Sequence, residues 1–250
     1  MPSEVLIQRN GAVVEVVLNR PHRRNALVGP MIEELLHAIE TVSSDPGVNA
    51  LLLRGEGGAF CSGVDLDAVG TDPPPPWLAG YSKMWVEIQV ALYRCPVPII
   101  GALERFAING GGPLASCCDL LIAGETAYLQ VGEVRQGTSP AMNVAWLLLR
   151  HGEAVAMRVA LTGDRVLGPE LLRLGIATEV VPDAQVLARA REIAASMASF
   201  PPEGVRKVKA MIRGIGTLDD PEDFFRQGFD WHNVSPGRGT LRVGKASAQV

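Results

Sequence analysis

Two glycine-rich segments could supply backbone N–H groups to a reacting carbonyl oxygen. The first covers residues 55–66, with the sequence GEGGAFCSGVDL, and the second covers residues 109–112, with the sequence NGGG. Each follows an apolar stretch that predicts a β-strand, so each is expected to form a tight turn at a strand end. Two main-chain N–H groups that converge on one oxygen form an oxyanion hole, which stabilises negative charge developing on a carbonyl. The pair of segments therefore predicts chemistry at a carbonyl group.

Several other chemistries lack their sequence signatures. The GxSxG motif of serine hydrolases and the Walker phosphate-binding motif are absent. Residues 55–58 begin like a dinucleotide-binding loop, but Phe60 occupies the position of the third glycine. The four histidines are isolated and have no metal-ligand spacing. A single glycine turn is most simply a structural connection, so the functional interpretation depends on the two turns occurring together.

The composition describes an ordinary globular chain. Of the 250 residues, 47% are hydrophobic and 20% are charged, and the net charge is −4. The basic residues are scattered, which argues against a nucleic-acid-binding surface. The four cysteines form no CxxC pair and no visible disulfide framework, which predicts reduced thiols and a cytoplasmic location. We expect no signal peptide and no membrane partner, because no apolar run approaches the roughly 20 residues needed to span a bilayer.

The order of apolar runs and turn residues predicts an α/β fold with a parallel sheet and helical crossovers up to about residue 181, followed by helices. The same pattern predicts five local features: a hairpin turn at Asn10-Gly11, an amphipathic helix over residues 31–42, buried strands over residues 50–53 and 97–103, Pro113 as the first residue of a short helix, and Asp183 as the N-cap of a helix over residues 184–198.

Five motifs resemble, in the same order, those of the crotonase (enoyl-CoA hydratase/isomerase) superfamily. They are LNRPHRRNAL at residues 18–27, AFCSGVDL at residues 59–66, the segment from AINGG to CD at residues 107–119, LTGD at residues 161–164 and GIATEVV at residues 175–181. The resemblance extends from about residue 5 to residue 214. It implies a repeated β-β-α core, two roughly perpendicular sheets and a C-terminal helical region.

The same resemblance implies the organisation and the ligand of the protein. It implies a core domain over residues 1–195 and a helical trimerisation region over residues 196–250, with trimers that often pair into hexamers. The implied substrate is an acyl-CoA thioester, and the coenzyme A that this substrate carries is the only cofactor expected. The oxyanion-hole donors would be the backbone N–H groups of Val64 and Gly110.

Residues that the resemblance assigns to coenzyme A lie in two loops: Arg24, Ala26, Leu27, Asp65 and Leu66. Backbone groups of these loops would cradle the adenine, and the Arg24 side chain could meet a phosphate. A solvated surface pair is the alternative for Arg23-Arg24. Lys207 and Lys209 are further candidates for phosphate contact. The carboxylates of Asp65 and Asp119 are expected to accept hydrogen bonds from backbone groups and to cap helices.

The reaction depends on which carboxylates stand beside the hole. Hydratases of the family carry two glutamates, and the chain matches only the second of them, at Glu133; the first position is Pro113. Dienoyl-CoA isomerases carry a further acid at the position of Ala141. One carboxylate can move a proton from C2 to C4 of a 3-enoyl thioester, whereas hydration normally uses two. The pattern thus resembles the 3,2-enoyl-CoA isomerases.

Alternatives remain at two levels. At the level of function, they are an enoyl-CoA hydratase or related lyase, and a catalytically impaired protein that binds CoA esters. At the level of residues, Glu133 could be a surface glutamate beside Arg135. Glu104, which replaces a common family residue, is interpreted as a surface charge in preference to a substitute acid.

Overall fold

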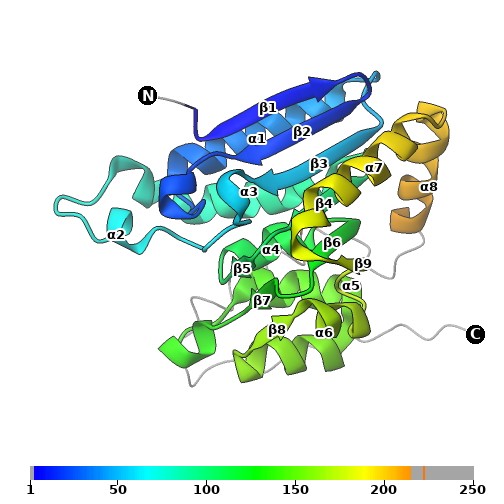
Figure 1. The fold of residues 1–250 in the computed structure, drawn as a ribbon. Coiled ribbons are helices and arrows are strands. Elements are labelled where there is room, and N and C mark those ends of the chain that lie inside the picture. Colours follow the sequence, from blue (N-terminus) through cyan, green and yellow to red (C-terminus); the bar gives the residue numbers. More distant parts are fainter. Residues whose placement is uncertain (1–2, 215–221, 223–250) are drawn as a thin grey trace, which may run out of the picture.

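The computed structural model describes residues 3–214 and Glu222, and these form a mixed α/β fold with two sheets (Figure 1). The larger sheet has six strands in the order β1-β2-β3-β4-β6-β9. Its strands are β1 (Val5–Asn10), β2 (Val13–Leu18), β3 (Ala50–Gly55), β4 (Ile99–Leu103), β6 (Leu120–Gly124) and β9 (Glu179–Val181). All neighbouring pairs are parallel except the β1–β2 hairpin, so the predicted parallel sheet is confirmed.

The smaller sheet carries one of the two glycine turns. Its strands, in the order β5-β7-β8, are β5 (Phe106–Ile108), β7 (Tyr128–Gln130) and β8 (Arg165–Leu167). The second glycine segment directly follows β5. Helices α4 (Gly111–Ser116), α5 (Ala141–Thr162) and α6 (Gly168–Arg173) lie around this sheet in the lower half of Figure 1.

Helices cover both faces of the larger sheet (Figure 1). Helix α1 (Gly29–Ser44) contacts β1, β2 and α3 (Tyr81–Arg94), and α7 (Val186–Ala198) packs on β3 and β4. Side chains of β3 alternate between the two layers, since Leu51 and Leu53 join the core with α1 and Leu52 joins the core with α7. A strand buried on both faces reads as a continuous apolar run, which is why this strand was predictable.

Three local predictions were wrong by a few residues. The hairpin turn is Gly11-Ala12, because Asn10 pairs with Val13 at the end of β1. Helix α4 begins at Gly111, two residues before Pro113, because the Gly112 N–H already donates to Asn109 O at 2.9 Å. Asp183 starts a 3-10 helix, and its carboxylate accepts from the Thr126 N–H and hydroxyl in place of capping α7.

The remaining α-helices of the described residues are α2 (Leu66–Val69) and α8 (Pro202–Gly214). The predicted boundary at residue 195 falls inside α7, and the division into a core and a trimerisation region stays a prediction. Most of the predicted C-terminal region, residues 215–221 and 223–250, lies outside the described residues. Among the described helices, none combines the length and the apolar character needed to cross a membrane.

Candidate active site

The first glycine segment is held between two neighbouring stretches of chain. On one side, the Cys61 N–H donates to Phe106 O at 3.1 Å and the Ile108 N–H donates to Cys61 O at 3.0 Å. On the other side, Leu27 bridges Val64 in parallel fashion, through bonds from the Leu27 N–H to Gly63 O and from the Asp65 N–H to Leu27 O. In such a bridge the N–H of the central residue points away from its partner. The Val64 N–H is therefore directed away from Leu27.

Val64 and Gly110 lie against each other. A Cβ placed on Gly110 would lie 3.5 Å from Val64 N, and a Cβ placed on Gly63 would lie 3.4 Å from Gly110 N. Among the hydrogen bonds of the described residues, none has the N–H of Val64 or Gly110 as its donor. The structure thus brings together the two N–H groups that were predicted to form the hole.

Glu133 is tied to the Gly110 loop through Asn109. Glu133 is half-buried at the start of a 3-10 helix after β7. Asn109 Oδ1 accepts from the Gly132 N–H at 2.8 Å, and the Asn109 N–H donates to Gln130 O at 2.8 Å. Because Asn109 directly precedes Gly110 and Gly132 directly precedes Glu133, these bonds fix the carboxylate-bearing turn beside the second glycine loop.

Asn143 is a site residue that the sequence analysis missed. It lies in the first turn of α5 and is only 2% exposed. Its side-chain nitrogen donates to Glu133 Oε1 at 3.2 Å and to Asn109 O at 3.0 Å. One sequence signal could have indicated it, since Asn143 carries the only side-chain amide in the otherwise apolar stretch of residues 141–149.

Pro113 lies on α4, three residues after Gly110. It is buried, and the helix sequence GGPLAS carries no acidic side chain. Pro113 sits in the first turn, where a missing N–H costs nothing because the first N–H groups of a helix have no partner within it. The position of the family's first glutamate thus holds an apolar, non-ionisable side chain.

The loops assigned to coenzyme A lie side by side, and the Ser62 N–H donates to Arg24 O at 3.1 Å. Arg24 is exposed, Ala26 and Leu27 are buried, and Leu66 is 69% exposed. The Asp65 carboxylate is 3% exposed and caps α2 by accepting from the Ala68 N–H at 3.2 Å. The predicted capping role of Asp65 is therefore confirmed.

Arginines hold the Asp65 carboxylate within the protein. Arg23 Nη2 lies 2.8 Å from Oδ1 and Arg20 Nη1 lies 2.9 Å from Oδ2. Hydrogen bonds from Arg23, and then from Arg20, hold the pKa of Asp65 well below its usual range. Arg23 is consequently engaged with a carboxylate, and of the Arg23-Arg24 pair it is Arg24 that extends into solvent. The Asp65 carboxylate and the Asp65 N–H, which donates to Leu27 O at 2.9 Å, are thus both engaged within the protein.

Three other charged residues were considered for the site, Glu104 as a substitute acid and Lys207 and Lys209 for phosphate contact. Glu104 is half-buried, burial raises its carboxyl pKa, and its charged neighbours are Arg54, Glu56 and Arg191. Lys209 is buried and donates to Val97 O at 2.8 Å, so it is not available for phosphate contact. Lys207 is exposed and pairs with Glu203 across one helical turn.

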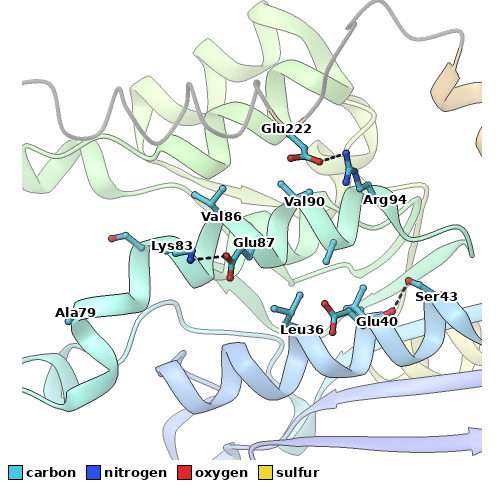
Figure 2. Close-up of a pocket in the computed structure, with 13 residues that line it drawn as sticks. Leu36, Glu40, Ser43, Ala79, Lys83, Val86, Glu87, Val90, Arg94 and Glu222 are labelled. Atoms are coloured by element: carbon cyan, nitrogen blue, oxygen red, sulfur yellow. Dashed lines mark hydrogen bonds and ion pairs between the residues drawn. The ribbon is translucent and has the colours of Figure 1, made fainter.

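A surface groove of about 950 Å³ lies between α1 and α3, away from the glycine loops (Figure 2). The apolar side chains of Leu36, Val86 and Val90 are among those that line it, and Glu222 pairs with Arg94 at its edge. None of the predicted site residues lines this groove. No group of three or more potential metal ligands gathers among residues 3–214 and 222.

Comparison with known proteins identifies the family of the chain. The model of the family described as enoyl-CoA hydratase/isomerase matches residues 8–222. A putative enoyl-CoA hydratase of Thermus thermophilus is 33% identical over 218 residues, which are 86% of each chain. An enoyl-CoA hydratase of Mycobacterium tuberculosis is 31% identical over 224 residues, covering 88% of this chain and 84% of that protein.

Solved structures of similar proteins have the same fold as this chain. An enoyl-CoA hydratase/isomerase from Xanthobacter autotrophicus superposes with a TM-score of 0.82 at 28% identity, covering 92% of this chain and 86% of that chain. An enoyl-CoA hydratase from Bacillus anthracis superposes with a TM-score of 0.79 at 27% identity, covering 91% of this chain and 90% of that chain. The expected crotonase-like α/β fold is thus confirmed. The chain belongs to the enoyl-CoA hydratase/isomerase family of the crotonase superfamily.

Proposed function

We propose that this chain is a 3,2-enoyl-CoA isomerase in which Glu133 is the only catalytic carboxylate. One observation carries the proposal: Glu133 is held beside the Gly110 loop by Asn109 and Asn143, while the position three residues after Gly110 is the buried Pro113. The thioester carbonyl oxygen would accept hydrogen bonds from the N–H groups of Val64 and Gly110. The acyl-CoA would extend along the loop at Arg24.

In the proposed reaction a single base removes a proton from one carbon and then returns it at another. The Glu133 carboxylate takes a proton from C2, and the released electron pair moves into the carbonyl to give a dienolate. The two N–H groups stabilise its oxygen. Protonated Glu133 then returns the proton to C4, the carbonyl re-forms, and the double bond lies between C2 and C3. The substrate and product are isomers, so the step needs no redox cofactor.

Hydration of a 2-enoyl-CoA is the second candidate. The names of the relatives favour it, since the proteins of Thermus thermophilus and Mycobacterium tuberculosis are both called enoyl-CoA hydratases. Hydration requires that a water be positioned and that a proton be delivered to C2, a task that two carboxylates normally share. Pro113 has no proton to give or take, which is why the isomerase is our first proposal. A homotrimer or a dimer of trimers in the cytoplasm remains a prediction.

The test offers the purified protein a 3-enoyl-CoA and, separately, a 2-enoyl-CoA, and identifies the products by mass spectrometry and NMR. Isomerisation of the first substrate supports the proposal, and consumption of the second alone contradicts it. Glu133→Gln should lower turnover by about 10²–10⁴-fold while ligand affinity is kept, because it removes the general base. Glu153→Gln, at an exposed position of α5, is the control and should retain activity. Ligand binding without turnover in the wild type would favour the CoA-ester-binding alternative.

A further inference from the structure

The hydrogen bond from Asn143 to Asn109 O acts on the peptide group that contains the Gly110 N–H. Asn109 O and Gly110 N belong to one planar unit, and this peptide is trans, since the cis peptide of the described residues is Asp72-Pro73. In a trans peptide the carbonyl and the N–H point in opposite directions. Asn143 Nδ2, which holds the Asn109 carbonyl at 3.0 Å together with the Gly112 N–H at 2.9 Å, therefore helps to set the direction of the Gly110 N–H. It further polarises that N–H, because hydrogen bonds in a chain strengthen one another.

The same nitrogen also holds the base. Asn143 Nδ2 lies 3.2 Å from Glu133 Oε1, and a primary amide has two N–H groups, one for each acceptor. The side chain is 2% exposed, so water does not compete for these donors. Asn143 is thus bonded to both working parts of the proposed site, the carboxylate and the peptide of the oxyanion donor.

Gly112 makes room for this arrangement. A Cβ at Gly112 would lie 2.1 Å from Asn143 Oδ1, a separation at which one of the two groups must move. Gly112 follows Gly110 on the same loop and lies on α4, which packs against α5. The loop that supplies the N–H therefore also fixes the place of the asparagine amide.

We propose that Asn143 is a positioning residue that couples the Glu133 carboxylate to the Gly110 oxyanion donor. This inference rests on the proposed function, because it assumes that Glu133 and Gly110 act on one thioester. Asn143 itself moves no proton. It aligns the base and the N–H with a single amide, so that loss of this amide disturbs both at once.

Few titratable side chains lie on the described elements that are next to Glu133 in the chain or in the glycine loops. On its own turn, Arg135 is directed to Asp164 at 2.6 Å. The first turns of α4 and α5 carry no titratable side chain. On the facing loop, Cys61 is a buried thiol and the Asp65 carboxylate is held by Arg20 and Arg23. Removing a hydrogen-bond donor from a carboxylate raises its pKa.

The test compares Asn143→Ala and Asn143→Asp with the wild type in kcat, KM and the pH dependence of kcat. Loss of a whole oxyanion donor costs about 10²–10³-fold, so a misaligned donor in Asn143→Ala should lower kcat about 10–100-fold with KM within about threefold. The acidic limb of the pH profile should move to higher pH. Asn143→Asp keeps the side-chain shape and places oxygens against Glu133 and the Asn109 carbonyl, so both effects should be larger.

Asn49 provides a matched control. It is also a 2% exposed asparagine, and its Nδ2 donates to two backbone carbonyls, those of Ala198 at 3.3 Å and Phe200 at 2.9 Å. Asn49→Ala should lower the melting temperature but leave kcat and the pH limb unchanged. If Asn143→Ala behaves in the same way, the positioning role is wrong. If Asn143→Ala does not fold, Asn143→Asp decides by the same two readouts.

Failure of this inference can be distinguished from failure of the proposed function. Turnover by the wild type tests the function, whereas the ratio of variant to wild type tests Asn143. Should the wild type hydrate 2-enoyl-CoA only, the isomerase proposal falls, and the same variants measured in hydration still decide the role of Asn143. Should the wild type turn over neither substrate, both proposals fall.

Discussion

Asp65 joins the two segments that were predicted to bind coenzyme A. Its carboxylate is bonded to Arg20 and Arg23 on one segment and caps α2 on the other. Asp65→Asn keeps the shape but removes the charge and leaves Arg20, which is 12% exposed, with one fewer partner. We expect a loss of about 3 kcal/mol in the free energy of unfolding, measured with urea at pH 7.

The effect of Asp65 should depend on pH. The arginine contacts hold its pKa below the usual range in the folded state, so its contribution is complete above the unfolded value of about 3.9 and is lost as the pH falls through the folded value. The difference between wild type and Asp65→Asn should be constant from about pH 8 to pH 5 and shrink below pH 4. The neighbouring Asp67 is 83% exposed, so Asp67→Asn should cost no more than about 0.5 kcal/mol. A cost as large as that of Asp65→Asn would contradict this account.

The site residues differ in how readily the sequence indicates them. Glu133 and the N–H groups of Val64 and Gly110 were selected from motifs in which position along the chain determines the assignment. Asn143 was missed because its acceptors are 34 and 10 residues away and belong to other elements. Lys209 was assigned the wrong surroundings for the same reason, since its charge was visible but its burial was not.

At the scale of elements, the first glycine loop depends on the backbone at Gly63. Gly63 has a φ of 90°, and a Cβ there would lie 2.8 Å from Ile108 O. Gly63→Ala should destabilise the protein by about 2 kcal/mol or more, because it adds this clash to the cost of a positive φ. It should also lower kcat at least tenfold, since the displaced loop carries the Val64 N–H. Thermal unfolding and steady-state kinetics measure the two effects.

Gly58 in the same loop separates these two causes. Its φ is 71°, but a Cβ there would have no atom within 4 Å. Gly58→Ala should cost about 1 kcal/mol through the backbone alone and leave kcat within about twofold. Equal losses of kcat in both variants would mean that loop strain, and not the close approach of the two glycine loops, controls the hole.

Helices and strands were predictable where residues close together in the sequence determine them. Helix α1 and strand β3 follow from periodicity, because their buried side chains repeat with the spacing of one helical face or fill a strand on both sides. The errors occur where a distant partner decides the local structure. Asp183 has the residue type of an N-cap, yet Thr126 from the β6–β7 connection takes its carboxylate. Asn10 tolerates a positive φ, yet pairing with Val13 keeps it in β1.

At the scale of the whole molecule, a partly buried ion cluster attaches α8 to the core. Asp119, at the start of β6, lies 2.6 Å from Lys209 Nζ, 3.1 Å from Arg213 and 3.5 Å from Arg150. Lys209 also donates to the carbonyl of Val97, 112 residues away in sequence. Family resemblance predicts that α8 belongs to the trimerisation region, and this cluster helps to hold α8 on its own chain.

Lys209→Met should loosen α8 while the sheet stays intact. The substitution preserves the apolar stem but removes two charge-assisted donors, which is expected to cost about 2–3 kcal/mol. Hydrogen exchange should quicken at the amides of α8 and remain slow in β3 and β4. Lys207→Met is the matched control, because Lys207 is 78% exposed and its partner Glu203 is 85% exposed, so its pair contributes little. If both variants unfold at the same urea concentration and exchange alike, the cluster does not anchor α8, and other contacts hold it, such as the bonds from Arg206 to the carbonyl oxygens of Asp45 and Val48.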